Sequence, residues 1–350
     1  MYSLSCQESS DLFEKNGKLK VDLYQKTKTL VVRSSGIAAT SNPSGNVMRT
    51  LFLSFVCLFL TEPLLQAQEP NYTRKEDVVY GRKYGMALTL DVFTPKKDAN
   101  GAGVIFCVSG GWFSSKEAIN PVIIGEALNR GYVVFAVVHG SQPRFTIPEV
   151  LDDMQRATRF IHLHAKEYGV DPKRLGITGG SAGGHLSLMQ GVGGNEGNPN
   201  TKDAVEKESS KVAAVACFFP PTDFLNYGKE GEIALGGGTL KGFRAPFNFI
   251  ERDPSTNAFV VITDEEKRKE IGKRISPVYH VTEKTPPTLI IHGDADRLVP
   301  IQQAELMIEK LTAKKIPCEL VVRKGAGHGW PTLIQDTKII VDWFDKYIGK

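Results

Sequence analysis

Short, continuous apolar runs recur along the chain and constrain its fold more than any other feature. Four of them are bounded by glycine or polar residues: 104–108, 132–138, 212–219 and 288–291. Runs of this kind fit strands that are buried on both faces of a parallel sheet. Apolar residues recur at helical spacing between these runs. The alternation of strands and helices predicts an α/β fold with one open, mostly parallel sheet and helices on both faces.

Three further segments complete the predicted sheet. Residues 87–93 alternate between apolar and polar side chains as an edge strand would, and Pro95 ends the segment. Residues 174–178 form a short strand before a glycine-rich turn, and residues 319–323 form the last strand. We therefore expect one α/β domain over residues 78–350, closed by an amphipathic C-terminal helix.

The alternation is interrupted between residues 222 and 276. This segment contains three consecutive glycines at 236–238, four aromatic residues between 243 and 259, and a charged helical patch. The pattern predicts an insertion above the sheet. Because loops at that edge of a sheet often carry function, we favour an insertion that caps a functional site over a remote surface excursion.

Residues 48–67 have the pattern of a secretory signal peptide. A basic start at Met48 precedes the apolar run 51–60, and a small residue follows at the predicted cut. The run is shorter than the ~20 residues that cross a bilayer, so we expect no permanent membrane span. We expect translation to begin at Met48, residues 1–47 to be a miscalled or disordered extension, and residues 68–77 to be a linker. The mature protein is then secreted or periplasmic; the alternative is a buried apolar helix.

Charge and cysteine content exclude several functional classes. The net charge is only +4, and the basic clusters at 267–269 and 273–274 are interleaved with glutamates. Such interleaving is typical of a solvated helix face and argues against a nucleic-acid partner. Cys107, Cys217 and Cys318 lie in or beside apolar runs, which favours free buried thiols. One disulfide among the three is the alternative. No Cys/His cluster indicates a metal site, and we expect no cofactor.

The pentapeptide Gly-Gly-Ser-Ala-Gly at residues 179–183 is the strongest candidate for chemistry. It matches G-x-S-x-G and lies between a predicted strand and a predicted helix. In this motif a sharp turn requires small residues beside the serine, and the strained backbone projects the hydroxyl from the sheet edge. The helix N-terminus points to the same place, where negative charge develops on a substrate. We therefore predict that Ser181 is a nucleophile.

A serine hydroxyl needs a base, and seven histidines lie in the predicted domain. His328 is the best candidate because it follows the last strand and has glycine on both sides, which lets the imidazole reach the serine. His185 lies one helical turn after the serine and is better explained as support for the turn. His292, at a strand end, is expected to be fixed by local hydrogen bonds. The remaining histidines have no motif: His139, His162, His164 and His280.

The acid that orients the base should lie between the serine and the histidine in this fold. Residues 292–300 follow a buried strand and carry two carboxylates to the carboxyl edge of the sheet. We predict that Asp296 fixes the histidine tautomer and stabilises the imidazolium. Asp294 is expected to form a turn by binding backbone amides. Asp223 is the alternative acid, and helix capping is its structural explanation.

Backbone amides that can bind an oxyanion are predicted after the strand 104–108. There a Ser-Gly-Gly-Trp sequence lets amides approach a substrate oxygen, so Gly110 and Gly111 are expected to form the oxyanion hole with the amide of Ala182. Trp112 and Trp330 are predicted to line the substrate pocket, with simple packing as the alternative for either residue.

With these elements in order, the chain resembles the α/β-hydrolase superfamily from about residue 78 onward. It looks closest to the esterase/lipase branch that contains hormone-sensitive-lipase-like, feruloyl and acetyl-xylan esterases, near prolyl-oligopeptidase catalytic domains. The matching segments are Asp-Pro-Lys-Arg at 171–174, Gly-Ser-Ala-Gly-Gly-His at 180–185, Pro-Thr-Asp at 221–223, Ser-Pro at 276–277, and the loops of Asp296 and His328.

One departure from this family concerns the predicted oxyanion loop. The family usually has His-Gly-Gly-Gly before the aromatic residue, whereas this chain reads Val108-Ser109-Gly110-Gly111-Trp112. The two glycines that are expected to donate amides remain. The histidine that braces the loop in the family is absent. The sequence therefore does not predict how rigid the loop is.

The resemblance implies a serine hydrolase that cleaves carboxylic esters through an acyl-enzyme. Its substrate would be a small-molecule or carbohydrate-linked ester. Two alternatives remain: a peptidase of the prolyl-oligopeptidase type, and a non-catalytic binding protein on the same fold. The residues before 78 include no propeller-like domain that would gate peptides, and an intact triad disfavours a binding protein. The sequence indicates no oligomeric state.

Overall fold

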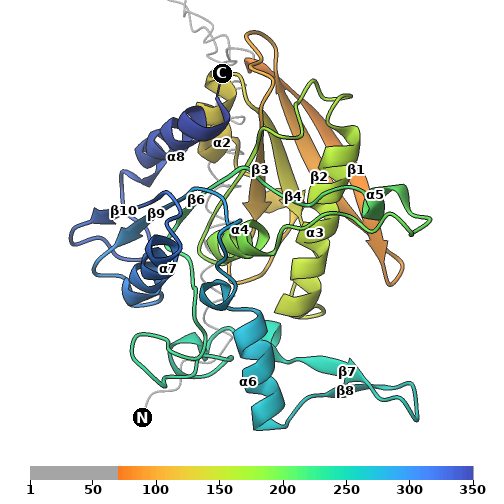
Figure 1. The fold of residues 1–350 in the computed structure, drawn as a ribbon, viewed down its shortest axis with the longest axis vertical. Coiled ribbons are helices and arrows are strands. Elements are labelled where there is room, and N and C mark those ends of the chain that lie inside the picture. Colours follow the sequence, from red (N-terminus) through yellow and green to blue (C-terminus); the bar gives the residue numbers. More distant parts are fainter. Residues whose placement is uncertain (1–69, 350) are drawn as a thin grey trace, which may run out of the picture. The chain divides into compact units, whose positions relative to one another are not determined.

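The predicted apolar runs form the centre of an eight-stranded sheet (Figure 1). The computed structural model describes residues 70–349. Its central parallel strands are almost entirely buried, as strands covered on both faces must be. They are β3 (Gly103–Val108), β4 (Val133–Val138), β5 (Leu175–Gly180), β6 (Ala214–Phe218) and β9 (Thr288–Gly293). The predicted fold class is thus confirmed.

The strand order is β1-β2-β4-β3-β5-β6-β9-β10. β1 (Tyr72–Lys83) and β2 (Met86–Pro95) form an antiparallel pair, and β2 is also antiparallel to β4. At the other edge, β10 (Cys318–Arg323) is parallel to β9. β5 therefore lies inside the sheet, and its carboxyl end is flanked by those of β3 and β6.

Two predictions about the first strands are wrong. Residues 87–93 do not form an edge strand, because β1 covers the outer side of β2. Residues 72–77 belong to β1 and not to a linker over 68–77. The side chains of β1 are mostly polar and exposed, so the strand carries little apolar signal in the sequence. It is held by main-chain hydrogen bonds of the ladder with β2.

Helices cover both faces of the sheet with separate apolar clusters. On one face, α3 (Ile147–His164), α4 (Ala182–Gly193) and α7 (Gln302–Ala313) bury their apolar stripes. On the other face, α2 (Pro121–Asn129) and α8 (Leu333–Ile348) do the same. The remaining short helices are α5 (Ala204–Lys207), η2 (Lys116–Ala118), η3 (Gly238–Leu240), η4 (Ala245–Phe247) and η5 (Pro277–Tyr279).

The predicted insertion lies beyond the edge where the central strands end (Figure 1). It contains the hairpin of β7 (Ile250–Arg252) and β8 (Phe259–Val261), followed by α6 (Glu265–Arg274). Its buried Phe247 packs edge-on against Trp112, with ring centroids 5.3 Å apart. This aromatic contact joins the insertion to the loop that follows β3.

The predicted signal at 48–67 and the residues before it lie outside the described residues. Among the helices of residues 70–349, none is both long and apolar enough to cross a bilayer. Within the same residues, no group of three or more His, Cys, Asp or Glu side chains could hold a metal ion. The prediction of free buried thiols is confirmed for Cys107 and Cys217, whereas Cys318 is free but only half-buried.

Candidate active site

Ser181 occupies the sharp turn between β5 and α4. Its φ of 54° and ψ of −119° are strained for a residue with a side chain. A Cβ atom at Gly179 would lie 2.5 Å from the carbonyl carbon of Gly183, and one at Gly183 would lie 2.7 Å from the oxygen of Cys107. Both outer positions of the motif therefore accept only glycine. The backbone amide of Ser181 donates to the carbonyl of Phe218 at 3.0 Å, which fixes the turn to β6.

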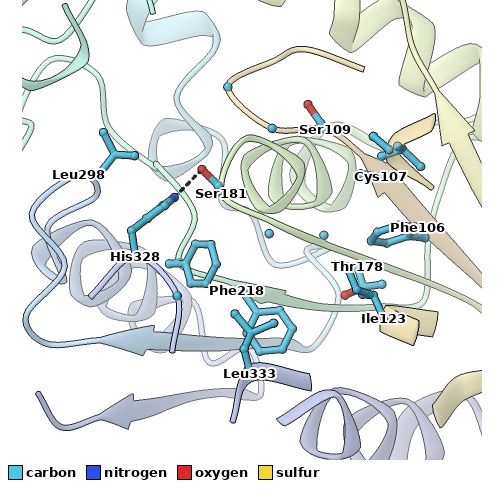
Figure 2. Close-up of a pocket in the computed structure, with 18 of the residues that line it drawn as sticks. Phe106, Cys107, Ser109, Ile123, Thr178, Ser181, Phe218, Leu298, His328 and Leu333 are labelled. Carbon is cyan, nitrogen blue, oxygen red and sulfur yellow. Dashed lines mark hydrogen bonds between the residues drawn. The ribbon is translucent and has the colours of Figure 1, made fainter. Parts of the chain in front are cut away.

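Ser181, His328 and Asp296 form one hydrogen-bonded chain. The Oγ of Ser181 lies 2.9 Å from Nε2 of His328, a residue 147 positions away (Figure 2). Nδ1 of His328 lies 2.7 Å from Oδ2 of Asp296. Because an ionised carboxylate only accepts, Nδ1 carries the proton and Nε2 accepts from the serine hydroxyl. The structure thus brings together the three residues that the sequence singled out.

Asp296 is held as an ionised acceptor. Its Oδ1 accepts hydrogen bonds from the amides of Leu298 and Val299, at 2.9 and 3.0 Å. Burial raises the pKa of the Asp296 carboxyl, but its interactions with His292 and His328 outweigh burial and hold the pKa well below its usual value. His292 donates from Nε2 to the carbonyl of Val299 at 2.8 Å, which confirms the predicted local hydrogen bond.

The conformation of the loop that carries His328 depends on its glycines and on Asp294. Gly325 and Gly329 have φ values of +71° and +112°, which favour glycine. Oδ1 of Asp294 accepts from the amide of Gly325 at 2.6 Å. Asp294 thus binds a backbone amide as predicted, but that amide belongs to the loop of His328 and not to its own turn. The ring of Phe219 packs against the imidazole of His328, with centroids 4.5 Å apart. Together these contacts keep the imidazole beside the serine.

Asp223, the alternative acid, makes no contact with His328 in the described part of the chain. Its Oδ1 accepts from the amides of Leu225 and Asn226, at 2.9 and 3.2 Å. The hydroxyl of Tyr279 donates to the same carboxylate at 3.0 Å. The carboxylate thus holds a local turn. The helix-capping explanation is wrong, because the next helix in the described part of the chain, η3, begins only at Gly238.

Two of the three predicted oxyanion donors are free. Ala182 is the first residue of α4, so its amide has no acceptor within the helix. The amide of Gly111 has no acceptor among residues 70–349. The prediction for Gly110 is wrong for this conformation, because its amide donates to the carbonyl of Phe113 at 3.0 Å. Phe113 returns a bond to the carbonyl of Gly110, which closes a tight bridge.

Neither tryptophan lines the cavity beside Ser181, so the prediction for this pair is wrong. Trp112 is only 2% exposed, and its indole N–H donates to Nδ1 of His185 at 3.2 Å. The indole N–H of Trp330 donates to Oδ2 of Asp336 at 2.7 Å. Each N–H finds an acceptor inside the fold; the ring of Trp112 is buried in the core, and the ring of Trp330 is half-buried and packs against it. Nε2 of His185 donates in turn to the carbonyl of Ile275 at 2.7 Å, so His185 supports the loop as well as the turn.

A cavity of about 580 Å³ opens beside Ser181 and His328. In Figure 2, His328 lies on one side of Ser181, whereas Ile123 and Phe106 lie on the other. The lining is mainly apolar, and the insertion contributes Phe243 to it. The sequence missed this lining, because α2 was not predicted and apolar residues inside buried strands carry no motif.

Residues 90–311 match the family model BD-FAE. The chain belongs to the BD-FAE family. This BD-FAE chain is 30% identical to a probable carboxylic ester hydrolase, LipM, of Mycobacterium tuberculosis, over 69% of the chain and 52% of LipM. It is 27% identical to the esterase LipC of the same organism, over 75% of the chain and 61% of LipC. The chain thus spans little more than half the length of these relatives.

Among solved structures, this BD-FAE chain is similar to a truncated form of a carbohydrate esterase from gut microbiota. The TM-score is 0.62 at 26% identity, and the match covers 79% of this chain and 97% of that one. The thermophilic esterase Est2 of Thermogutta terrifontis, solved with propionate, has a TM-score of 0.59 at 24% identity. The match covers 79% of this chain and 94% of the Est2 chain. At 24% identity, the likeness to Est2 shows the fold alone.

Proposed function

We propose that this chain is a serine esterase that hydrolyses carboxylic esters through an acyl-enzyme. The observation that carries the proposal is the hydrogen-bonded chain from Ser181 through His328 to Asp296, at 2.9 and 2.7 Å. This arrangement supplies a nucleophile, a general base and a group that orients the base. The family membership and the esterase relatives support the same activity.

In the first step, His328 takes the proton from Ser181 as its oxygen attacks the ester carbonyl. The amides of Gly111 and Ala182 bind the oxyanion that forms. The tetrahedral intermediate then collapses, the carbon–oxygen bond to the alcohol breaks, and His328 gives its proton to the departing alkoxide. In the second step, a water molecule loses a proton to His328 and attacks the acyl-enzyme. The carboxylic acid leaves, and Ser181 recovers its proton.

Replacing the nucleophile tests this proposal. Ser181→Ala is expected to lower kcat for p-nitrophenyl acetate by about 10⁶, the loss associated with removing such a serine. A fluorophosphonate probe should label the wild-type protein and leave Ser181→Ala unlabelled. Retained activity in the variant would remove the proposal. A wild-type protein that neither reacts with the probe nor turns over esters would point to a binding protein.

For the substrate, we propose an ester with an apolar acyl group on a carbohydrate. The mainly apolar cavity beside Ser181 supports the acyl part. The likeness to a carbohydrate esterase supports the alcohol part. A panel of acetyl, feruloyl and longer acyl esters, on p-nitrophenol and on xylo-oligosaccharides, tests both parts. Peptide substrates in the same panel separate an esterase from a peptidase.

We also propose that the protein is exported with residues 48–67 as its signal. The basic start and short apolar run support this proposal. Mass spectrometry of the native protein is expected to find an N-terminus near residue 68 in the extracellular or periplasmic fraction. A peptide from residues 1–47 would contradict translation from Met48.

A further inference from the structure

The oxyanion loop, residues 108–113, lacks the histidine expected within it, but a histidine that directly follows the neighbouring strand contacts it. β3 and β4 are parallel, and their last residues Val108 and Val138 are paired in register. The residues that follow, Ser109 and His139, therefore leave the sheet side by side. The Oγ of Ser109 lies 2.9 Å from Nε2 of His139, whose ring is buried.

The direction of this hydrogen bond follows from the other nitrogen of the ring. Nδ1 of His139 lies 2.7 Å from the carbonyl oxygen of Gly140, which only accepts. Nδ1 therefore carries the proton, and Nε2 accepts from the hydroxyl of Ser109. Burial lowers the pKa of His139 to about 4, so the ring stays a neutral acceptor near neutral pH.

The segment behind His139 is itself anchored to two other elements. The amide of Gly140 donates to Oδ2 of Asp153 on α3 at 2.9 Å. Oδ1 of Asp153 pairs with Nζ of Lys83 at the end of β1, at 2.6 Å. Lys83 also donates to the carbonyl of Glu149 at 3.0 Å. The hydrogen bonds through Asp153 and Lys83 thus hold the segment of His139 without any contribution from the oxyanion loop.

The same segment contacts the far side of the loop. The amide of Gln142 donates to the carbonyl of Trp112 at 3.3 Å. The indole of Trp112 is tied separately to His185 at 3.2 Å. Gly111, whose amide is free, therefore lies between an anchor at Trp112 and an anchor at Ser109. The side chain of Ser109 has His139 as its hydrogen-bond partner, so a single substitution can release that anchor.

We infer that the hydrogen bond from Ser109 to His139 holds the oxyanion loop in place of the missing loop histidine. Ser109 and His139 are then positioning residues: they act through the backbone to set the Gly111 amide where the oxyanion forms. This inference rests on the proposed esterase function. The bond stabilises the transition state more than the bound ester, since the Gly111 amide binds most strongly once charge has developed on the oxygen.

The test compares Ser109→Ala with Ser109→Thr, which keeps a hydroxyl. Because the Gly111 amide is displaced and not removed, Ser109→Ala should lower kcat for p-nitrophenyl acetate by about tenfold, less than the loss of an oxyanion donor. KM should change less than twofold. The inhibition constant of phenylboronic acid, which forms a tetrahedral anion on Ser181, should rise by about the same factor as kcat falls. Ser109→Thr should restore most of both losses.

A double substitution tests whether the two side chains act as one unit. His139→Asn, which is too short to reach Ser109, should cost about as much in kcat as Ser109→Ala. The double variant should lose no more than the larger single loss, because both changes break one contact. Losses that multiply would overturn the inference. Unchanged kcat and boronate inhibition in Ser109→Ala would overturn it even if His139→Asn fails to fold.

The outcome for the wild-type protein separates this inference from the proposed function. A wild-type protein without ester turnover and without fluorophosphonate labelling removes the esterase proposal itself. A wild-type protein with full turnover, beside a Ser109→Ala variant of equal kcat, removes only the role of Ser109 and His139. A loss confined to KM in Ser109→Ala also contradicts the inference, since it indicates a changed substrate pocket.

Discussion

The ring of Phe243 packs directly on the backbone of Gly111, so that a Cβ atom at Gly111 would lie 2.5 Å from Cε1 of Phe243. Phe243 belongs to the insertion, whereas Gly111 belongs to the oxyanion loop. The insertion therefore packs against the residue proposed to donate one oxyanion hydrogen bond, and it also lines the cavity beside Ser181. This contact gives the predicted cap a physical role in the site.

Gly111→Ala is expected to lower kcat by about 100-fold, approaching the loss of an oxyanion donor. The new methyl group meets Phe243, and the φ of +55° at Gly111 is unfavourable for alanine. Kinetics with p-nitrophenyl acetate measure the loss. Adding Phe243→Ala relieves the clash but not the backbone strain, so it should restore activity only in part. Wild-type kcat in Gly111→Ala would contradict the role of this amide.

Asp296→Asn is expected to lower kcat by about 10⁴, because an amide no longer holds the His328 tautomer or stabilises the imidazolium. Asp223→Asn is the matched control, since this carboxylate contacts Tyr279 and backbone amides but not the triad. It should keep kcat within about threefold and lower the free energy of unfolding by about 1–2 kcal/mol. Steady-state kinetics and urea unfolding measure the two effects. The reverse ranking of kcat would make Asp223 the acid.

The sequence predicts the centre of this fold, and the edge strand β10, better than the opposite edge at β1. β3, β4, β6 and β9 are buried on both faces, so their apolar runs are continuous and unambiguous. β1 carries no such signal, because an exposed strand at the edge of a sheet can be polar throughout and still pair through its backbone.

The same contrast holds for the site. Ser181, Asp296 and His328 could be predicted because their chemistry demands particular residue types in particular turns. The Gly110 amide could not be assigned from sequence, since its bond to Phe113 depends on the conformation of the loop. The contact of Ser109 with His139 depends on the pairing of β3 with β4, which local sequence does not encode.

The free energy of unfolding is expected to fall as the pH decreases from about 6.5 to about 4. Burial lowers the pKa of His139 and of His185 to about 4 in the folded protein, from an ordinary value of 6.5. Above pH 6.5 both rings are neutral in both states. Between these two pKa values the unfolded chain binds protons that the folded protein does not. Each ring therefore lowers the free energy of unfolding by about 1.4 kcal/mol for each pH unit of acidification.

Urea unfolding at several pH values measures this slope. His139→Asn removes one of these two rings with a lowered pKa and should reduce the slope between pH 6 and 4.5. His164→Gln, at a half-exposed position on α3, keeps both His139 and His185 and serves as the control. A His139→Asn variant with the wild-type slope would show that this ring does not titrate as stated.

Ile123→Trp is expected to restrict the acyl groups that the cavity accepts. Ile123 lines the cavity on the side of Ser181 away from His328 (Figure 2). In the proposed mechanism the alcohol departs beside the imidazole, so we expect the acyl chain to extend toward Ile123. The larger ring should lower kcat/KM for p-nitrophenyl hexanoate by at least about tenfold, a cost typical of losing a few methylene contacts, and change p-nitrophenyl acetate less than threefold. Val122→Trp is the matched control, because Val122 is the next residue on α2 and is 60% exposed. Equal effects of Ile123→Trp on both esters would place the acyl chain elsewhere.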